Sequence, residues 1–304
     1  MSHDKPLDST WDDPLPHALT RVRTYLGPPC RECDVAIIAI HGRGDNARDF
    51  CDVFVPHLRQ FFKSTLEGEV DEDDLTPFQT AREDARLTIR ALEAQDAAWF
   101  LGHKSQIGSD IAFQGPYIYG SLQKLRSEIE FLNSRGIPNH KIILVGYSQG
   151  AIMINTYLIK ALEQIASSKS KPAALQVTDQ LPIPAKFLAW AGTTFSFGTH
   201  FPIKAWPYLE AATSDADSKP STNQTEEIGF SVESHQQCGL SDRYFTQQEI
   251  EDVAAKIANA SSKAFGPDEA GIKVSLAMEP GIHAVLPGMI ARLIQMIQDV
   301  LAQP

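Results

Sequence analysis

Long apolar runs are absent from this sequence. Although 43% of its 304 residues are hydrophobic, no stretch approaches the roughly 18–20 apolar residues that a membrane-spanning helix needs. The opening sequence, MSHDKPLDSTWDDPLPH, has neither the basic start nor the apolar core of a secretory signal. We therefore expect a cytoplasmic protein with no stable membrane insertion.

Basic clusters and paired cysteines are also scarce. The formal net charge is −11 and the Lys and Arg residues are scattered singly, whereas phosphate recognition needs them clustered, so we expect no nucleic-acid partner. Four cysteines in a chain of this length do not make a disulfide framework. Cys30 and Cys33 form a CxxC, but no second CxxC or histidine pair completes a metal site.

What the sequence does contain is short, strongly apolar segments that alternate with stretches of helical spacing. Such segments are typical of strands buried on both faces. Three are expected to be strands of this kind: Asp34–Ile40, Lys141–Tyr147 and Lys186–Gly192. Two further segments, Ile228–Gly239 and Ile272–Gly281, are candidate strands. Ala85–Ala94 fits either a strand or a helix, and its short length before polar residues favours a strand.

The helical stretches show one apolar face. Leu122, Leu125, Ile129 and Leu132 recur at helical spacing, and a similar stripe runs from Ile290 to Leu301. Strands alternating with helices imply right-handed crossovers and a mostly parallel sheet covered on both faces. The expected fold class is therefore α/β, with three αβα layers.

Polar segments interrupt this pattern without starting a new core. Residues 67–76 are acidic and residues 212–227 are polar and low in complexity. We expect residues 1–304 to form a single domain, in which residues 1–33 supply an N-terminal extension and the first strands. Residues 193–227 are expected to be a polar insertion or a lid-like excursion.

A Gly-x-Ser-x-Gly motif follows the expected strand that ends at Tyr147. The motif is weak evidence alone, but a buried strand before it and a helix after it are the context of a serine nucleophile. The tight turn needs small residues two positions before and after the serine, which Gly146 and Gly150 provide, and Ala151 is also small. The sequence thus indicates Ser148 as a nucleophile.

A serine hydroxyl needs a base, and in this topology the acid and then the histidine follow the serine along the chain. His283 comes after the last expected strand and directly before the last helix. His235 lies inside a strand pattern, which favours a packed histidine, and His200 precedes every plausible acid. His283 is therefore the expected base.

The acid should lie after the second-to-last strand. Asp242 comes three residues after Gly239, where that strand is expected to end. Asp215 and Asp217 fall in the polar insertion, before this strand. Glu279 is near the histidine in sequence but could replace Asp242 only if the Asp242 loop were turned away.

An oxyanion needs two main-chain N–H donors. One is expected from Gln149, at the start of the helix after the serine. The other is expected from Arg43, in the loop after an early strand, where Gly42 and Gly44 permit close approach. His41 is interpreted as orienting this loop rather than as catalytic.

Together, the sequences HGRGD, GYSQGA, GLSD and GIHAV resemble the acyl-protein thioesterase and carboxylesterase/phospholipase group of the α/β-hydrolase superfamily. The resemblance covers roughly Ala36 to Leu301. It implies an α/β-hydrolase fold with Ser148, Asp242 and His283 as the catalytic triad. The sequence AAWF resembles the tryptophan-bearing segment of that group and implies that Trp99 and Phe100 line the acyl site.

Three departures from the group accompany this resemblance. Ala151 replaces a glycine, Cys238 stands where the acid loop normally has histidine before its glycine, and GIH replaces a Gly-x-Gly-His pattern. None removes a triad residue, although they weaken inferences about the substrate.

The expected function is a serine hydrolase that cleaves a carboxylic ester or thioester through an acyl-enzyme, without a metal or organic cofactor. Its substrate would be a small molecule or an acylated protein, and the chain would act as a monomer or a homodimer. One alternative is an acyl-transferring or lactone-opening enzyme in a biosynthetic pathway. Another is a hydrolase fold that only binds a partner.

Overall fold

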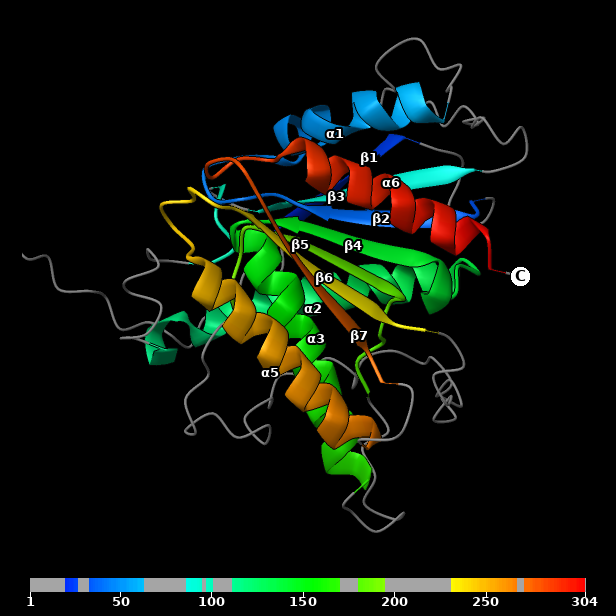
Figure 1. Cartoon of the computed structure of the whole chain (residues 1–304). Coiled ribbons are helices and arrows are strands. Elements are labelled where there is room, and N and C mark those ends of the chain that lie inside the picture. Colours follow the sequence, from blue (N-terminus) through cyan, green and yellow to red (C-terminus); the bar gives the residue numbers. More distant parts are fainter. Residues whose placement is uncertain are drawn as a thin grey trace, which may run out of the picture.

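The computed structural model describes residues 20–26, 33–62, 86–94, 97–100, 111–169, 180–194, 231–266 and 271–303. Their strands form one seven-stranded sheet in the order β1-β3-β2-β4-β5-β6-β7 (Figure 1). β1 is antiparallel to β3, and every other neighbouring pair is parallel. The strands are β1 (Thr20–Leu26), β2 (Val35–Ile40), β3 (Leu87–Ala94), β4 (Ile142–Tyr147), β5 (Lys186–Trp190), β6 (Glu233–Gly239) and β7 (Lys273–Glu279).

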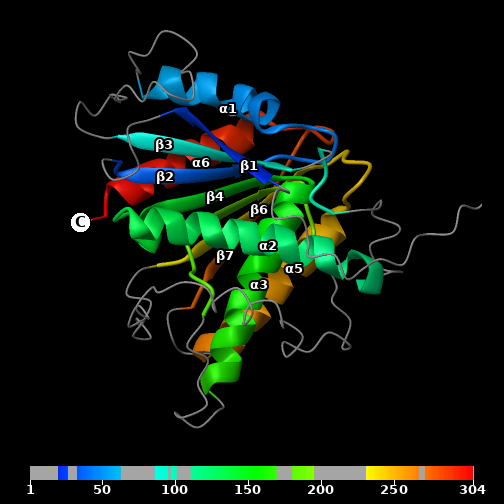
Figure 2. The same ribbon diagram turned by 180° about the vertical axis from the view of Figure 1, so that it is seen from behind.

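Helices cover both faces of this sheet. α1 (Ala47–Phe61) and α6 (Pro287–Leu301) pack on one face, and α2 (Ile111–Ser134), α3 (Gln149–Lys169) and α5 (Gln247–Phe265) pack on the other (Figures 1 and 2). A short 3-10 turn, Asn139–Lys141, leads into β4. The three-layer αβα arrangement around a mostly parallel sheet is confirmed.

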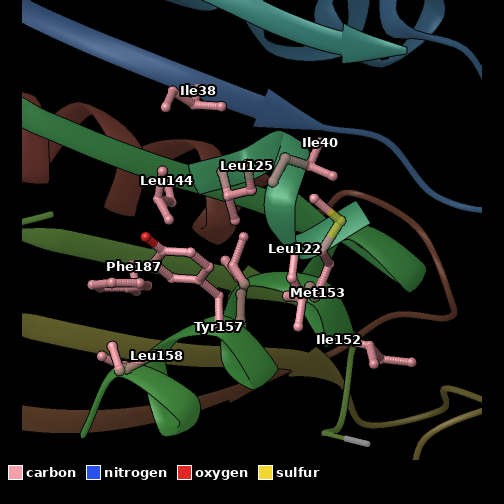
Figure 3. Close-up of a cluster of buried hydrophobic side chains, with 14 of the residues drawn as sticks. Ile38, Ile40, Leu122, Leu125, Leu144, Ile152, Met153, Tyr157, Leu158 and Phe187 are labelled. Atoms are coloured by element: carbon pink, nitrogen blue, oxygen red, sulfur yellow. The ribbon is translucent and has the colours of Figure 1, made fainter. Parts of the chain in front are cut away.

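The larger of two apolar cores lies between the sheet and helices α2, α3 and α5. Figure 3 shows Leu122 and Leu125 from α2 close to Tyr157 from α3 and Phe187 from β5. All four side chains are at most 1% exposed, and complete burial of such a side chain is worth about 1.5–3 kcal/mol. The apolar stripe predicted from Leu122 to Leu132 is therefore the buried face of α2.

Most expected elements are present, and Ala85–Ala94 contains strand β3, the alternative that the sequence favoured. Two features differ from the expectation. The described part of the expected strand Ile228–Gly239 is regular only from Glu233. Sequence reasoning missed α5, although Thr246 and Glu249 form a capping box at its start.

Parts of the N-terminal segment and of the polar insertion lie outside the described residues. Residues 1–19, 27–32 and 195–230 fall in this group, as do His200, Asp215 and Asp217. Within the N-terminal segment, the structure describes β1 as an edge strand. Among the helices that the structure describes, none has the length and apolar character to cross a membrane.

Strand β6 is buried along its whole length despite its polar sequence, ESHQQCG. The side chains satisfy one another, as buried polar groups must. Glu233 is paired with Lys186 and Arg292, and His235 Nδ1 lies 2.7 Å from Ser275 Oγ. His235 is 7% exposed, so the interpretation of a packed histidine is confirmed.

Candidate active site

Ser148 lies on the turn between β4 and α3, at the carboxyl edge of the sheet. Its φ of +52° is in the left-handed region that side chains rarely adopt, so the turn is strained. A β-carbon at residue 146 would lie 2.5 Å from the Gly150 carbonyl, and one at residue 150 would lie 2.1 Å from the Ile40 oxygen. Both positions therefore need glycine, as the motif predicted.

The contact at Gly150 also has a consequence for the neighbouring loop. Because Gly150 lies against Ile40 and His41, the start of α3 sits directly on the end of β2. The chain then continues into Gly42, where a β-carbon would lie 3.2 Å from the Ser148 β-carbon. The early glycine-rich loop is thus held beside the serine.

Ala151 stands where the resembled group has a glycine, and its methyl group fits because Gly192, which lies against it, has no side chain. A β-carbon at Gly192 would lie 2.4 Å from the Ala151 methyl carbon and 2.9 Å from the Ser148 carbonyl oxygen. Gly192 follows β5, whose last carbonyl accepts a 2.8 Å hydrogen bond from Ser148 N–H. Sequence reasoning did not identify Gly192 as part of this turn.

Ser148, His283 and Asp242 form one hydrogen-bonded chain. His283 Nε2 lies 3.2 Å from Ser148 Oγ, and His283 Nδ1 lies 2.7 Å from Asp242 Oδ2. Both distances are in the range of hydrogen bonds between a nucleophile, a base and an orienting group. Ser148 and His283 are 135 positions apart in the sequence, and Asp242 and His283 are 41 positions apart. The fold therefore brings together residues that are distant in the chain.

The loops that carry the acid and the base are bonded to each other. They follow the neighbouring parallel strands β6 and β7, so both begin at the same edge of the sheet. Leu240 N–H donates to Glu279 O and Ser241 N–H donates to Gly281 O, each at 2.8 Å. These main-chain bonds fix the relative positions of Asp242 and His283.

The Asp242 carboxylate is completely enclosed, with a side-chain exposure of 0%. Burial opposes its ionisation, but hydrogen bonds from His283 and from the N–H groups of Tyr244 and Phe245 outweigh burial and lower the pKa of Asp242. An ionised carboxylate can only accept hydrogen bonds. His283 therefore carries its proton on Nδ1, which leaves Nε2 free to accept the serine proton.

Three aromatic rings surround the His283 imidazole. The ring centroids of Tyr147, Tyr244 and Phe245 lie 5.0, 4.8 and 5.6 Å from that of His283. They limit the exposure of the His283 side chain to 15%. Sequence reasoning missed all three, although Tyr147 precedes the serine and the other two follow the acid closely.

Arg43 and Gln149 occupy the places expected of oxyanion donors. Gln149 is the first residue of α3, where a helix offers main-chain N–H groups that have no partner within the helix. Arg43 directly follows Gly42 in the loop beside Ser148. Both main-chain groups are therefore candidates to bind an oxygen next to the serine.

His41 joins the candidate oxyanion loop to the end of β3. Its Nε2 accepts a 3.1 Å hydrogen bond from Ala94 N–H, so its proton is on Nδ1, which donates to Gly42 O at 2.6 Å. Burial lowers the pKa of His41 and keeps this neutral form. The structure thus gives His41 the orienting role that the sequence predicted.

Trp99 and Gln149 extend this hydrogen-bond network from His41 to the turn that carries Ser148. Trp99 Nε1–H donates to His41 O at 2.8 Å, and the Gln149 carboxamide accepts from Trp99 N–H at 3.1 Å and donates to Phe100 O at 3.3 Å. Gly44 N–H donates to Ala97 O at 2.7 Å. The Gln149 side chain thus fixes residues 97–100, a role that sequence reasoning did not consider.

Trp99 and Phe100, expected to line an acyl site, are each only 2% exposed. In the described structure they pack with the core on the α2 and α3 side of the sheet.

Glu279, the alternative acid, is bonded elsewhere: its carboxylate accepts from Gln237 Nε2 and from Gly288 N–H at the start of α6. Asp242 therefore occupies the position next to His283.

The described residues contain no group of three or more His, Cys, Asp or Glu side chains arranged to hold a metal ion. The three cysteines in this part of the chain, Cys33, Cys51 and Cys238, are buried and are not in disulfide bonds. Cys30, the other half of the CxxC, lies outside the described residues.

Several solved structures with a similar architecture are esterases. The chain is similar to a phospholipase/carboxylesterase from Dyadobacter fermentans, with a TM-score of 0.54 and 16% identity, over 93% of this chain and 96% of that one. It is also similar to esterase PE8, with a TM-score of 0.54, 15% identity and coverage of 93% and 100%. A carboxylesterase from Bacillus cereus gives a TM-score of 0.50 at 12% identity, with coverage of 93% and 95%.

No protein-family model and no curated protein sequence matches this chain. At identities this low, similarity to solved structures shows the fold alone. The chain has the α/β-hydrolase fold, which confirms the fold expected from its motifs.

Proposed function

We propose that this protein is a serine hydrolase that cleaves a carboxylic ester or thioester through a covalent acyl-enzyme. The observation that carries the proposal is the chain of hydrogen bonds from Ser148 through His283 to Asp242, built at the carboxyl edge of the sheet. Solved structures with this fold include a phospholipase/carboxylesterase and an esterase, which favours an ester as the substrate.

In the first step, Ser148 Oγ attacks the substrate carbonyl carbon while His283 Nε2 accepts the hydroxyl proton. The carbonyl double bond opens to a tetrahedral oxyanion, which the N–H groups of Arg43 and Gln149 would stabilise. Asp242 keeps the imidazole in the correct tautomer and stabilises its positive charge.

The oxyanion then collapses, and the bond from carbon to the leaving alcohol or thiol breaks. His283 gives its proton to the leaving group, and the acyl group stays on Ser148. A water molecule then attacks the acyl-enzyme. His283 takes a proton from the water while the water oxygen bonds to the carbonyl carbon. The bond from this carbon to Ser148 Oγ then breaks, and His283 returns the proton to the serine oxygen. These steps need no redox partner.

An apolar substrate is favoured by the side chains beside the site. Leu240 and Ile282, on the loops that carry the acid and the base, are 58% and 66% exposed. Large apolar side chains with this exposure next to a reactive centre favour an apolar acyl or alcohol group over a charged one. A series of p-nitrophenyl esters and acyl thioesters of increasing chain length measures this preference.

A fluorophosphonate probe tests the proposal directly, because it phosphonylates an activated serine. We expect labelling at Ser148 in the wild-type protein and none in Ser148→Ala. A folded wild-type protein that is not labelled would instead support a hydrolase fold used only for binding. Product analysis with and without an added alcohol or amine separates hydrolysis from acyl transfer.

A further inference from the structure

We propose that Cys238 is a positioning residue of the active site, whose thiol donates a hydrogen bond to the triad acid and holds it in place. The inference rests on the proposed function of Ser148 and deepens it. Cys238 Sγ lies 3.3 Å from Asp242 Oδ2, the same oxygen that accepts from His283 Nδ1 at 2.7 Å.

The direction of this hydrogen bond follows from the chemistry of both groups. An ionised carboxylate has no proton to give, whereas a thiol has one. Burial raises the pKa of the Cys238 thiol to about 12, and the negative charge of Asp242 adds to this effect. The sulfur is therefore protonated at neutral pH and is the donor.

A second acceptor near the sulfur is a poorer one. Phe245 O lies 3.8 Å from Cys238 Sγ, while the charged Asp242 oxygen is nearer. Because hydrogen bonds to an ionised acceptor are stronger, the single thiol proton points to the carboxylate.

With the thiol included, all the acceptor capacity of Asp242 is used. Oδ1 accepts from the N–H groups of Tyr244 at 2.7 Å and Phe245 at 3.1 Å. Oδ2 accepts from His283 and Cys238. Two donors on each oxygen fill the roughly four lone-pair sites of a carboxylate, so rotation of the side chain would break several bonds at once.

The position of Cys238 makes this contact rigid. The residue is 0% exposed and belongs to β6, which is paired with β5 and β7. Its thiol therefore approaches Asp242 from the sheet, whereas the other donors come from the acid loop and the base loop. The histidine normally found here in the resembled group is replaced by a smaller donor.

Removing the donor should have two effects on catalysis. The carboxylate becomes freer to rotate, which lowers the rate of the chemical step. Its negative charge is also less neutralised, which favours the protonated form of His283 and moves the acid limb of the kcat/KM profile to higher pH. The titratable or charged groups near Asp242 and His283 include Tyr147, Tyr244, Asp45, Glu249 and Arg243, whose guanidinium lies over the Tyr244 ring.

The test compares Cys238→Ala and Cys238→Ser with Cys33→Ala, using a short p-nitrophenyl ester. Cys33 is also buried, at 6% exposure, but it lies before β2, at the opposite edge of the sheet. We expect Cys238→Ala to lower kcat about tenfold, the loss of roughly one hydrogen bond to a charged group, with little change in KM. We expect its acid limb to move upward, while Cys238→Ser and Cys33→Ala stay near wild type.

Equal losses in Cys33→Ala and Cys238→Ala, or equal behaviour of the serine and alanine variants, would overturn the proposal. So would an alanine variant with unchanged kcat and pH profile. If Cys238→Ala does not fold, Cys238→Val fills the space without a donor and serves in its place. A wild-type protein that is neither labelled at Ser148 nor active contradicts the proposed function instead.

Discussion

Gly192 faces Ala151 so closely that a β-carbon on the glycine would lie 2.4 Å from the alanine methyl carbon. Real β-carbons do not approach each other to this distance, so the two positions share the space for one methyl group. The residue after β5 and the helix after the serine are consequently coupled. The Ala151 methyl group, which departs from the resembled motif, is accommodated because Gly192, 41 positions later in the chain, has no side chain.

Gly192→Ala should therefore disturb the nucleophile turn. Overpacking at such a site costs about 1–3 kcal/mol, and we expect both a lower unfolding midpoint in urea and reduced labelling at Ser148. Ala151→Gly alone should be nearly neutral for labelling.

The double variant Ala151→Gly, Gly192→Ala is the informative control. It relieves the contact between the methyl groups but keeps the approach to Ser148 O at 2.9 Å, so it should recover part of the loss. Strictly additive effects on stability would show that the two positions are not coupled.

Trp99→Phe should weaken the candidate oxyanion loop. It removes the 2.8 Å bond from Trp99 Nε1 to His41 O and leaves a buried carbonyl without that donor, at a cost of about 1–3 kcal/mol. If the loop orients the Arg43 N–H, kcat/KM should fall about tenfold, mainly through kcat. Steady-state kinetics with one activated ester measures the effect.

Trp190→Phe provides a matched comparison for this variant. Trp190 is 0% exposed, but its Nε1 has no hydrogen-bond partner among the residues that the structure describes, so the substitution removes the same atoms without breaking such a bond. An equal loss of kcat in both variants would indicate a general packing effect.

The triad should act as a unit in kinetics. Ser148→Ala and His283→Ala should each reduce kcat by a factor on the order of 10⁶, and the double variant should lose little more. The reason is that neither residue catalyses the proton and acyl transfers without the other. Losses that multiply in the double variant would contradict the assignment.

Acid should destabilise the fold through His235. Burial and, next, the positive charge of Arg292 lower the pKa of His235 from 6.5 to about 4. Between these values the unfolded chain binds a proton here that the folded chain does not, so stability falls as the pH drops. The shift corresponds to about 3 kcal/mol across this window.

His235→Gln should remove this dependence. Urea unfolding at pH 7 and pH 4.5 should show a smaller loss of stability in the variant than in the wild type, even if the variant is less stable at both. His57→Gln, at an exposed position on α1, should keep the wild-type dependence. The same dependence in His235→Gln and the wild type would contradict the buried neutral histidine.

Local patterns were sufficient to predict most of the elements. Apolar runs such as Val35–Ile40 are unmistakable because a parallel strand covered on both faces has no polar side. β6 was harder, since its residues satisfy one another across the sheet and toward α6, and α5 was missed despite its capping box. The partners of the β6 side chains lie far apart in sequence, so spacing does not show them, whereas the capping box of α5 is a local signal that predicts a helix start.

The candidate site divides in the same way. Ser148, Asp242 and His283 were predicted from chain order and strand ends, because the carboxyl ends of parallel strands share one edge of the sheet. The aromatic rings around His283, the Gln149 carboxamide and Gly192 were not. Their roles depend on which side chains meet after the loops close.

By itself, the sequence determined the alternation of strands and helices, the position of the strained serine turn and the order of its partners, because these follow from local apolar pattern and chain direction. Only the tertiary structure decided that Trp99 is buried and bonded to His41, that Glu279 is bonded to α6 rather than to His283, and that the Cys238 thiol donates to Asp242. Each of these outcomes depends on distances between side chains from separate elements, and packing sets those distances.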